Sequence, residues 1–471
     1  MRKVRNAFIG AATVTAAATA LAAGIPAAQA QDGPEAVGPK NVIVMISDGW
    51  GYHHIAATDY YRHGRAASQV YERFAVRSSM STYLAGGSYD PNATWSPFAH
   101  AASGATDSAA AATAMATGVK TYDGALGVDT DRKPLTNAFQ QAERAGRATG
   151  VVTSVQLSHA TPAGFVAHNT TRNDYSGIAR EMIYNSATDV IMGAGSPCHD
   201  DKGQPNGCTG KTQYVGGDAT WADLTDTDGA LGTDADGDGD KDPWKLLRTR
   251  EDFQSLTYGT APSRVLGVAP IAQTLQQKRP CARTAVNPIT GVRGCAETPG
   301  ETPGITSVPA LMEMSAAALN VLDEDPDGFG LLIEGGAVDW ASHDNSLGRL
   351  IEEQSEFNRA VEMVVAWINR HGGWEDNLLV VTGDHECGYL TGPNSGSGKN
   401  PQWTEVVNKG QGNLPLAEFH SGEHTNSLVP FYAQGTGSEL LSAAADQNDP
   451  VRGPYLDNTE LGRALHRMLG S

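Results

Sequence analysis

The stretch NVIVMISDGWG, residues 41–51, decides the expected fold. Between Asn41 and Ser47 it is a continuous apolar run rich in valine and isoleucine, which is typical of a strand covered on both faces in a parallel sheet. Similar runs recur at residues 150–154, 188–192, 330–333 and 378–382, and they alternate with helical patterns. We therefore expect an α/β fold in which one large, mostly parallel central sheet is flanked by helices.

One long helix and one irregular segment complete this outline. Residues 346–370 carry apolar side chains at helical spacing, and Gly372 follows them as a stop signal. Residues 196–306 break the rhythm, because they hold four of the five cysteines, many Gly and Pro residues and the acidic run DADGDGDKD. We interpret 196–306 as an inserted Cys- and Asp-rich crown within a single domain that spans residues 31–471.

The first 30 residues have the pattern of a secretory signal peptide. Arg2, Lys3 and Arg5 form a basic start, residues 7–23 are uncharged and weakly apolar, and residues 28–30 read Ala-Gln-Ala, a small-x-small cleavage pattern. No cysteine follows to take a lipid, and no later segment has the roughly 18 uninterrupted apolar residues of a membrane span. The sequence therefore predicts a secreted protein without a membrane anchor.

The overall charge limits the possible partners. The formal net charge is −19. A surface this acidic repels phosphate backbones, so we do not expect a nucleic-acid binding module. Acidic residues also suit a chain that holds divalent cations.

The cysteines fit an oxidising compartment. Cys198 and Cys208 flank one loop of the crown, and Cys281 and Cys295 flank another, so we expect two local disulfides. Cys387 is left over. We expect it to be a buried free thiol and not a metal ligand, because the other candidate donors near it are oxygen and imidazole groups.

Polar side chains gather where the predicted strands end. The carboxylate and histidine candidates in these segments are Asp48, Glu334, Asp339, His343, Asp384, His385 and His424. Because ligands collect at the carboxyl ends of parallel strands, we expect these side chains to share one crevice. Few basic residues accompany them, so bound divalent metal is the simplest way to neutralise the buried carboxylates.

The residue types indicate which metals would bind. Mixed Asp and His donors, such as Asp339 and His343 four residues apart, suit zinc with an open position. An all-oxygen donor set suits magnesium. Two neighbouring zinc ions can stabilise both the attacking and the leaving oxygen of an in-line displacement, which is the chemistry of phosphoryl transfer.

The segment TDSAAAATAMATG, residues 106–118, supplies a candidate nucleophile. Asp107 and Ser108 are residue types that cap helix N-termini, and capping alone would explain them. A serine at this position would also lie where N–H groups and the helix dipole favour an anion, so Ser108 could attack a phosphate held there. The alanines would let the helix pack closely against its neighbours.

Six segments together resemble the alkaline phosphatase family. They are VIVMISDGWG at 42–51, TDSAAAATAMATGVKT at 106–121, SHATPAGFVAHNTTR at 158–172, EGGAVDWASHDN at 334–345, VVTGDHE at 380–386 and GEHTN at 422–426. They occur in the order of the family, and the resemblance extends from about residue 41 to the end of the chain. The crown contributes little to it.

The resemblance implies a role for each site residue. The first zinc would be held by Asp339, His343 and His424, the second by Asp48, Asp384 and His385, and magnesium by Asp48, Thr161 and Glu334. Ser108 would be phosphorylated transiently, Arg172 would bind two phosphate oxygens, and Asp107 would position Arg172.

Two positions depart from the best-studied bacterial form of the family. His159 stands where that form has Asp, and Trp340 stands where it has Lys. Both would lie beside the metal and phosphate sites. They are expected to change water structure and magnesium affinity and to leave the reaction type unchanged.

The implied function is the hydrolysis of small-molecule phosphate monoesters to an alcohol and inorganic phosphate. Homodimers are common in the family, so a dimer is possible here. Two related activities stay open: a phosphatase dedicated to one phosphorylated metabolite, and a phosphodiesterase of the same superfamily. The Cys-x-Pro-Ser-Arg-like motif of sulfatases is absent.

A non-enzymatic alternative is an extracellular calcium-binding protein. Its basis is the alternating series Asp234, Asp236, Asp238 and Asp240, with Gly239 at the turn position of an EF-hand-like loop. Lys245 occupies the place where such loops need a bidentate Glu. A calcium site and a merely solvated acidic loop therefore both stay open.

Overall fold

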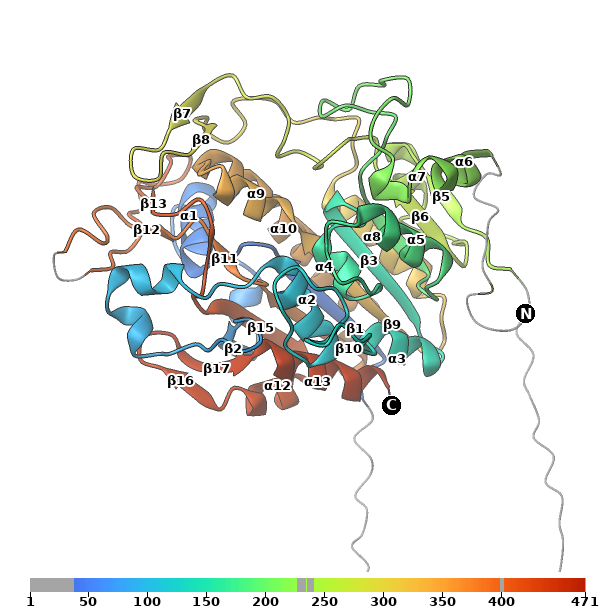
Figure 1. Ribbon diagram of the computed structural model, residues 1–471, viewed down its shortest axis with the longest axis horizontal. Helices are drawn as coiled ribbons and strands as arrows, with labels where there is room; N and C mark the ends of the chain where they lie inside the picture. The colour runs from blue at the N-terminus through green and yellow to red at the C-terminus, as the bar shows by residue number, and fades with distance from the viewer. Residues whose placement is uncertain (1–37, 227–233, 235–240, 399–401, 471) are drawn as a thin grey trace, which may run out of the picture. The chain divides into compact units, whose positions relative to one another are not determined.

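The structure is a computed structural model that describes residues 38–226, 234, 241–398 and 402–470. Its centre is an 11-stranded sheet (Figure 1). In spatial order the strands are β16 (Gln447–Asp449), β17 (Gly453–Asp457), β2 (Val76–Ser81), β15 (Val429–Gly435), β10 (Asn377–Thr382), β1 (Asn41–Ser47), β9 (Phe329–Gly335), β3 (Ala148–Gln156), β4 (Val190–Ala194), β6 (Val265–Val268) and β5 (Lys245–Leu247). From β10 to β5 all neighbours are parallel, whereas β15 is antiparallel to both of its neighbours. The expected mostly parallel α/β sheet is confirmed.

All five predicted strands are present. β1 has the predicted bounds, β3, β9 and β10 contain the predicted runs, and β4 begins at Val190 instead of at residue 188. Side chains of β1 alternate between two apolar layers, with Val42 and Val44 in one and Ile43 and Met45 in the other. Both layers are buried, which explains why the run lacks polar alternation.

Helices cover both faces of the sheet. The layer with Val42 includes α2 (Ser108–Thr117), α3 (Ala138–Arg144), α5 (Tyr175–Tyr184), α6 (Asp218–Asp226), α12 (Ser438–Ala444) and α13 (Asn458–Leu469), and the layer with Ile43 includes α7 (Arg250–Ser255), α8 (Leu311–Leu322) and α10 (Leu347–Ile368). Ala160 and Ala163 of α4 (Ala160–Gly164) join the first layer, and Ile55 of α1 (Tyr52–His63) joins the second. The other described helices are α9 (Ala337–His343) and α11 (Gly373–Asp376), with 3₁₀ turns at Tyr71–Arg73, Ala93–Trp95, Phe98–Ala102 and Gln213–Val215. Helix α10 confirms the long helix predicted for 346–370. Among the described helices, none combines the length and apolar character needed to cross a membrane.

The segment 196–306 is only partly separate from the sheet. Its strands β6 and β5 extend the edge of the main sheet, and β6 is fully buried, so this part of the expected crown belongs to the core. β7 (Thr284–Val286) and β8 (Arg293–Cys295) instead form a separate two-stranded hairpin (Figure 1). The predicted disulfides Cys198–Cys208 and Cys281–Cys295 are both formed, and Cys387 is buried and free.

Two predicted features fall outside the described residues. The signal peptide, residues 1–30, is one of them. Asp236, Asp238 and Asp240 of the acidic run are also not described, and Asp234 is exposed. The structure therefore leaves the calcium prediction untested.

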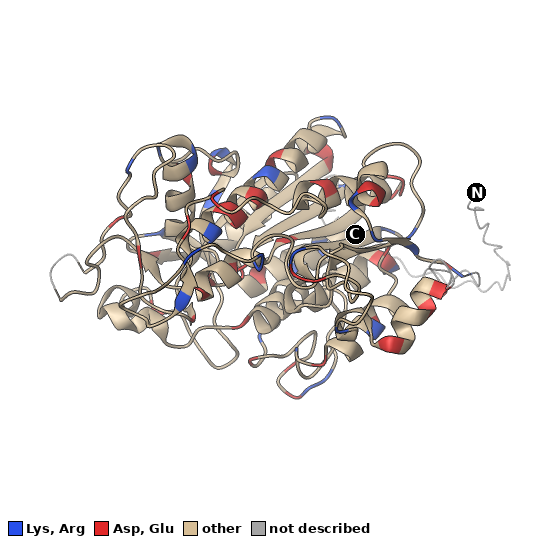
Figure 2. Cartoon of the chain, turned by 90° about the horizontal axis from the view of Figure 1, so that it is seen from above, with Lys and Arg blue, Asp and Glu red and all other residues tan. Residues whose placement is uncertain are grey.

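Charged residues lie mainly on helices and loops. Figure 2 shows acidic and basic positions interspersed there, whereas the strands of the sheet are almost free of both. Glu334 is an exception, because it is an acidic residue on a central strand, near the end of β9. Its side chain is fully buried. Such a buried carboxylate requires a partner.

Candidate active site

The candidate residues come together because three central strands end at the same level. In the sheet, Ile46 of β1 pairs with Thr382 of β10 on one side and with Glu334 of β9 on the other. Asp48 therefore emerges beside Asp384, as the sequence predicted. The short pair β11 (Glu386–Cys387) and β14 (His424–Thr425) then brings His424 alongside the segment after β10.

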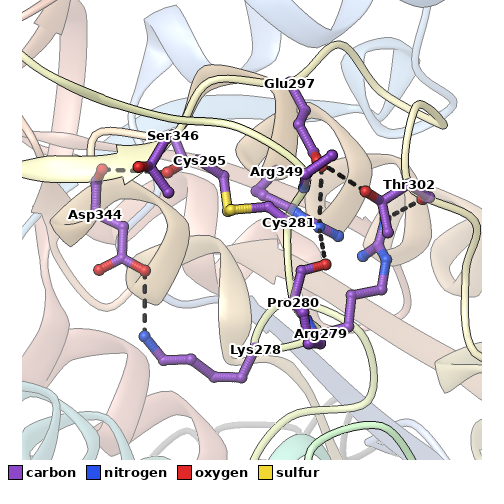
Figure 3. Close-up of a disulfide and its surroundings, with 12 residues drawn as sticks. Lys278, Arg279, Pro280, Cys281, Cys295, Glu297, Thr302, Asp344, Ser346 and Arg349 are labelled. Carbon is purple, nitrogen blue, oxygen red and sulfur yellow. Dashed lines mark hydrogen bonds and ion pairs between the residues drawn. A yellow bond between two sulfur atoms is a disulfide. The ribbon is translucent and has the colours of Figure 1, made fainter.

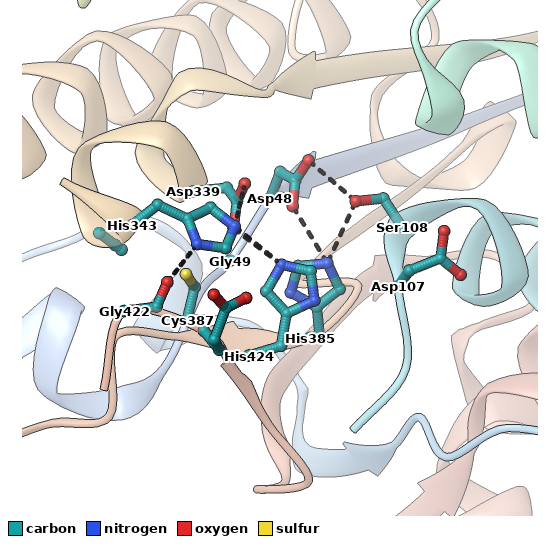
Figure 4. A network of polar contacts seen from close by, with 12 residues as sticks. Asp48, Gly49, Asp107, Ser108, Asp339, His343, His385, Cys387, Gly422 and His424 are labelled. Atoms are coloured by element: carbon teal, nitrogen blue, oxygen red, sulfur yellow. Dashed lines mark hydrogen bonds and ion pairs between the residues drawn. The ribbon is translucent and has the colours of Figure 1, made fainter. Parts of the chain in front are cut away.

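The first metal group consists of Asp339, His343 and His424. His343 Nε2 lies 3.3 Å from Asp339 Oδ2, and His424 Nε2 lies 3.4 Å from Asp339 Oδ1. The two Nε2 atoms are only 3.1 Å apart (Figure 4). This group has the mixed Asp and His donors that zinc prefers.

Backbone carbonyls set the tautomers of both histidines. His343 Nδ1 lies 2.6 Å from the carbonyl oxygen of Gly422, and His424 Nδ1 lies 2.8 Å from that of Thr106. Each Nδ1 can therefore donate a proton to a carbonyl oxygen, which turns the Nε2 atoms of both rings toward Asp339. Burial would lower the pKa of His343, but the charge of Asp339 outweighs burial and raises it to about 9, so without metal this ring pairs with the carboxylate as an imidazolium. A bound zinc ion would take the place of that proton.

The second metal group consists of Asp48, Asp384 and His385, all of which are buried. His385 Nε2 lies 3.2 Å from Asp384 Oδ2 and 3.4 Å from Asp48 Oδ1. Neither Asp48 Oδ1 nor Asp384 Oδ2 has a hydrogen-bond partner among the described residues. A buried carboxylate oxygen without a hydrogen-bond partner is free to bind a metal ion.

The third candidate group, Asp48, Thr161 and Glu334, offers only oxygen atoms. Thr161 Oγ1 and Glu334 Oε1 are buried and have no hydrogen-bond partner within the described chain, whereas Glu334 Oε2 accepts a hydrogen bond from Thr153. Burial raises the pKa of Asp48 well above its usual value, and the negative charge of Asp384 adds to this rise. The residues present therefore fit a bound magnesium ion.

Ser108 touches the second group. Its Oγ lies 3.1 Å from His385 Nε2 and 3.4 Å from Asp48 Oδ2, and Figure 4 shows it pointing toward both side chains. Ser108 is the first residue of α2 and is 2% exposed. The serine predicted as the nucleophile thus lies next to the second candidate zinc site.

Asp107 performs the two tasks expected of it. Its carboxylate accepts hydrogen bonds from the N–H groups of Ala109 and Ala110, and it also pairs with Arg172 Nη1 at 2.9 Å. Burial would raise the pKa of Asp107, but Arg172 and the backbone donors outweigh burial and lower it. Because Asp107 occupies two N–H groups of the first turn, our expectation that these free groups would hold a phosphate is wrong for Ala109 and Ala110. The N–H group of Ser108 is left for that purpose.

The small residues of α2 allow close packing, as predicted. Every residue of this helix is buried. A Cβ atom at Gly164 of α4 would come within 2.7 Å of the Ala112 side chain, and one at Gly462 of α13 would come within 2.6 Å of the Ala114 carbonyl oxygen. Larger side chains at these glycine or alanine positions would push α2, and with it Ser108, away from the metal groups.

The two unusual residues, His159 and Trp340, lie against each other with ring centres 5.7 Å apart. Burial and the charge of Arg172 lower the pKa of His159 to about 3, so its ring is neutral near pH 7. The ammonium group of Lys278, which comes from the crown, lies 5.4 Å from the centre of the Trp340 ring. No pattern in the sequence indicated that Lys278 approaches this position.

Cys387 lies close to the first metal group, and its sulfur is a fourth candidate donor there. Its sulfur is within 4.8 Å of the donor atoms of Asp339, His343 and His424. Burial raises the pKa of the thiol well above its usual value, and the charge of Asp339 adds to this. A bound metal ion would lower this pKa again, so the expectation that Cys387 is not a metal ligand stays a prediction.

When metal is removed, we expect Glu334 and Asp384 to contribute a loss of stability as the pH rises from about 4.5 to about 7. Burial raises the pKa of Glu334 from 4.5 to about 7 and that of Asp384 from 3.8 to about 6. Across this range the unfolded chain loses protons that the folded chain retains, so the free energy of unfolding decreases. Melting temperatures of the chelator-treated protein across this range would measure the decrease. Glu334→Gln, which cannot ionise, should show a smaller one; an equal decrease would contradict the assignment to Glu334.

Comparisons with known proteins identify the family and the fold. A family model described as Alkaline phosphatase matches residues 39–415. Alkaline phosphatase H of Pseudomonas aeruginosa (strain UCBPP-PA14) is 28% identical over 424 residues, covering 87% of this chain and 83% of that protein. The alkaline phosphatase of Escherichia coli (strain K12) is 28% identical over 446 residues, covering 87% of this chain and 84% of that protein. The solved alkaline phosphatase of the Antarctic bacterium TAB5 has the same fold, with a TM-score of 0.61, 22% identity, and coverage of 92% of this chain and 99% of that one.

Proposed function

This chain belongs to the alkaline phosphatase family and is a phosphatase, and from that premise we propose that it hydrolyses phosphate monoesters through a phosphoserine at Ser108. The observation that carries the proposal is the contact of Ser108 Oγ with the second metal group, at 3.1 Å from His385 Nε2. A hydroxyl in this position can be activated by a bound metal and directed at phosphorus.

We infer the metals from the donor atoms. The first group (Asp339, His343 and His424) and the second group (Asp48, Asp384 and His385) would each hold zinc, and Asp48, Thr161 and Glu334 would hold magnesium. When bound, the zinc ions would lower the pKa of the serine hydroxyl and of water, and would stabilise the charge on the attacking and leaving oxygens.

The protein's own residues would then carry out two displacements. Ser108 Oγ forms a bond to phosphorus while the ester P–O bond breaks, and the alcohol leaves with a proton. Arg172, aligned by Asp107 at 2.9 Å, binds two phosphate oxygens with its planar guanidinium group. Water then attacks the phosphoserine, inorganic phosphate leaves, and Ser108 is restored. Two inversions give net retention of configuration at phosphorus.

His159 and Trp340 are proposed to tune this site without taking part in the chemistry. A neutral imidazole at His159 places no negative charge near the oxygen-only group, so it would bind a magnesium-coordinated water more weakly than a carboxylate would. We therefore expect magnesium, and not zinc, to be the more weakly held metal.

Export to an oxidising compartment is supported by the two disulfides of the described chain. The signal peptide at residues 1–30 and a homodimeric state remain predictions from the sequence and from the resemblance.

Two measurements test the proposed function. The purified protein should hydrolyse an aryl phosphate monoester much faster than the corresponding diester. After acid quenching during turnover, the peptide that contains Ser108 should carry one phosphoryl group in its mass spectrum. Faster diester cleavage would favour the phosphodiesterase alternative, and activity confined to one phosphorylated metabolite in a panel of esters would favour the dedicated phosphatase. Phosphorylation of a different residue would contradict the role of Ser108.

A further inference from the structure

Asn345 lies at a junction of three segments next to the first metal group. It is a non-glycine residue with a left-handed backbone, at φ 48°. Its side-chain amide donates from Nδ2 to the carbonyl oxygens of Ser342 and Ser421, each at 2.8 Å. Its Oδ1 accepts from Asn287 Nδ2 at 2.9 Å and from Thr290 Oγ1 at 2.6 Å. Two donor and two acceptor contacts use the full capacity of one amide group.

The two carbonyls that Asn345 binds belong to the segments that carry the metal-binding histidines. Ser342 directly precedes His343 at the end of α9. Ser421 precedes Gly422, whose carbonyl oxygen accepts the Nδ1–H of His343 at 2.6 Å, and His424 follows two residues later. A shift of Asn345 would therefore change the separation of His343 and His424, whose Nε2 atoms are 3.1 Å apart.

The other side of Asn345 is held by a loop of the crown. Asn287 and Thr290 lie in the turn between β7 and β8, in a loop that the Cys281–Cys295 disulfide closes. Figure 3 shows this disulfide beside Ser346 and Arg349, the residues that begin the next helix.

Further contacts fix the base of the same loop. Lys278 Nζ lies 3.1 Å from Asp344 Oδ2 (Figure 3). Gln277 Nε2 lies 2.9 Å from the same oxygen atom. On the other side of the disulfide, Glu297 pairs with Arg349 at 3.2 Å, and both side chains are buried. The loop is therefore held at Asp344, directly after His343, and again at Arg349 in the next helix.

We propose that the disulfide-closed loop 281–295 positions the first metal group through Asn345. Asn345 is a positioning residue, because it touches neither substrate nor metal and acts on the backbone of the two histidine segments. The inference rests on the proposed function only in taking Asp339, His343 and His424 as a zinc site. It gives this part of the crown a specific task, which is to hold the two histidines at the separation that one zinc ion requires.

Zinc retention is the measurement that tests this proposal. The full chain, loaded with zinc, is equilibrated with buffers of decreasing free zinc concentration, and bound zinc is counted by elemental analysis. Asn345→Asp has the same shape but lacks both Nδ2 donors and adds a negative charge, which alone would favour zinc binding. In this variant one of the two zinc ions should nevertheless dissociate at a free zinc concentration about 10-fold to 100-fold higher than in the parent. Thr290→Val and the pair Cys281→Ser with Cys295→Ser should shift the same ion in the same direction. The control pair is Cys198→Ser with Cys208→Ser, which removes a disulfide of the crown that has no contact with Asn345 among the described residues, and it should match the parent.

The same substitution made in a variant whose first metal group is already weakened identifies which zinc ion is affected. In Asp339→Asn, which weakens the first group, adding Asn345→Asp should leave the retention of the remaining zinc unchanged. Retention equal to the parent in Asn345→Asp and Thr290→Val would overturn the proposal, as would an added loss in the Asp339→Asn background. If Asn345→Asp does not fold, Thr290→Val and the Cys281/Cys295 pair decide the question against the same control. Because zinc counting needs no ester, a parent protein that binds two zinc ions without hydrolysing esters would refute the proposed function and leave this inference standing.

Discussion

Replacing Ser108 with alanine is expected to lower kcat/KM for an aryl phosphate monoester by at least about 1,000-fold. The reason is geometric. Ser108 is 2% exposed, and its Oγ lies within hydrogen-bond distance of His385 Nε2. No other hydroxyl group of α2 can therefore take its place. Direct attack by water would have to replace covalent catalysis, without a nucleophile already aligned with phosphorus.

The control for Ser108→Ala is Thr117→Ala, in the same helix. Thr117 is the last residue of α2, at the opposite end of the helix from Ser108. Its hydroxyl donates a hydrogen bond to the carbonyl oxygen of Thr113 at 2.7 Å. Thr117→Ala should retain nearly full activity. Ser108→Ala should keep its metal content by elemental analysis, since all of the proposed ligands remain. Hydrolysis by Ser108→Ala within about tenfold of the parent would show that covalent catalysis at this serine is wrong.

The sequence predicted those parts of the structure that depend on short contiguous patterns. Residues 41–47 form a strand because every side chain is buried, whichever face it points to, and Asp48 follows directly where the strand ends. The parallel register then places Asp48 beside Asp384 and Glu334, so the convergence of these three carboxylates follows from strand ends alone. Capping by Asp107 is equally local and was likewise predictable.

Other features had no sequence signal because they depend on long-range contacts to the backbone. The carbonyls of Gly422 and Thr106 that orient His343 and His424 exist at every residue, so nothing in the residue types marks them. β2, with the sequence VRSSMS, lacks an apolar run, and only its neighbours β15 and β17 make it a strand. Asn345 contacts Asn287 and Ser421, and each of these residues lies more than 50 residues away from it in the sequence. No local sequence pattern relates the three segments.

Removal of metal should have an effect as large as the loss of Ser108. Treatment with a chelator is expected to reduce hydrolysis by at least about 1,000-fold, because the metal ions are proposed to supply several kcal/mol of charge stabilisation. Zinc should restore activity and magnesium alone should not, since His343, His385 and His424 present imidazole nitrogens that magnesium rarely accepts. Magnesium added after zinc should give at most a further increase, through the oxygen-only group.

Elemental analysis gives the decisive form of this prediction. The purified protein should contain about two zinc ions and one magnesium ion per chain, and the least tightly held should be magnesium. Cys387→Ala is the matched control, because its thiol lies within 4.8 Å of the first group and yet is expected not to bind zinc. If that variant lost one zinc, Cys387 would be a ligand and the donor set of the first group would be wrong. If magnesium alone restored the chelated parent, neither histidine-containing group would be a zinc site, and the activation of Ser108 would need a different explanation.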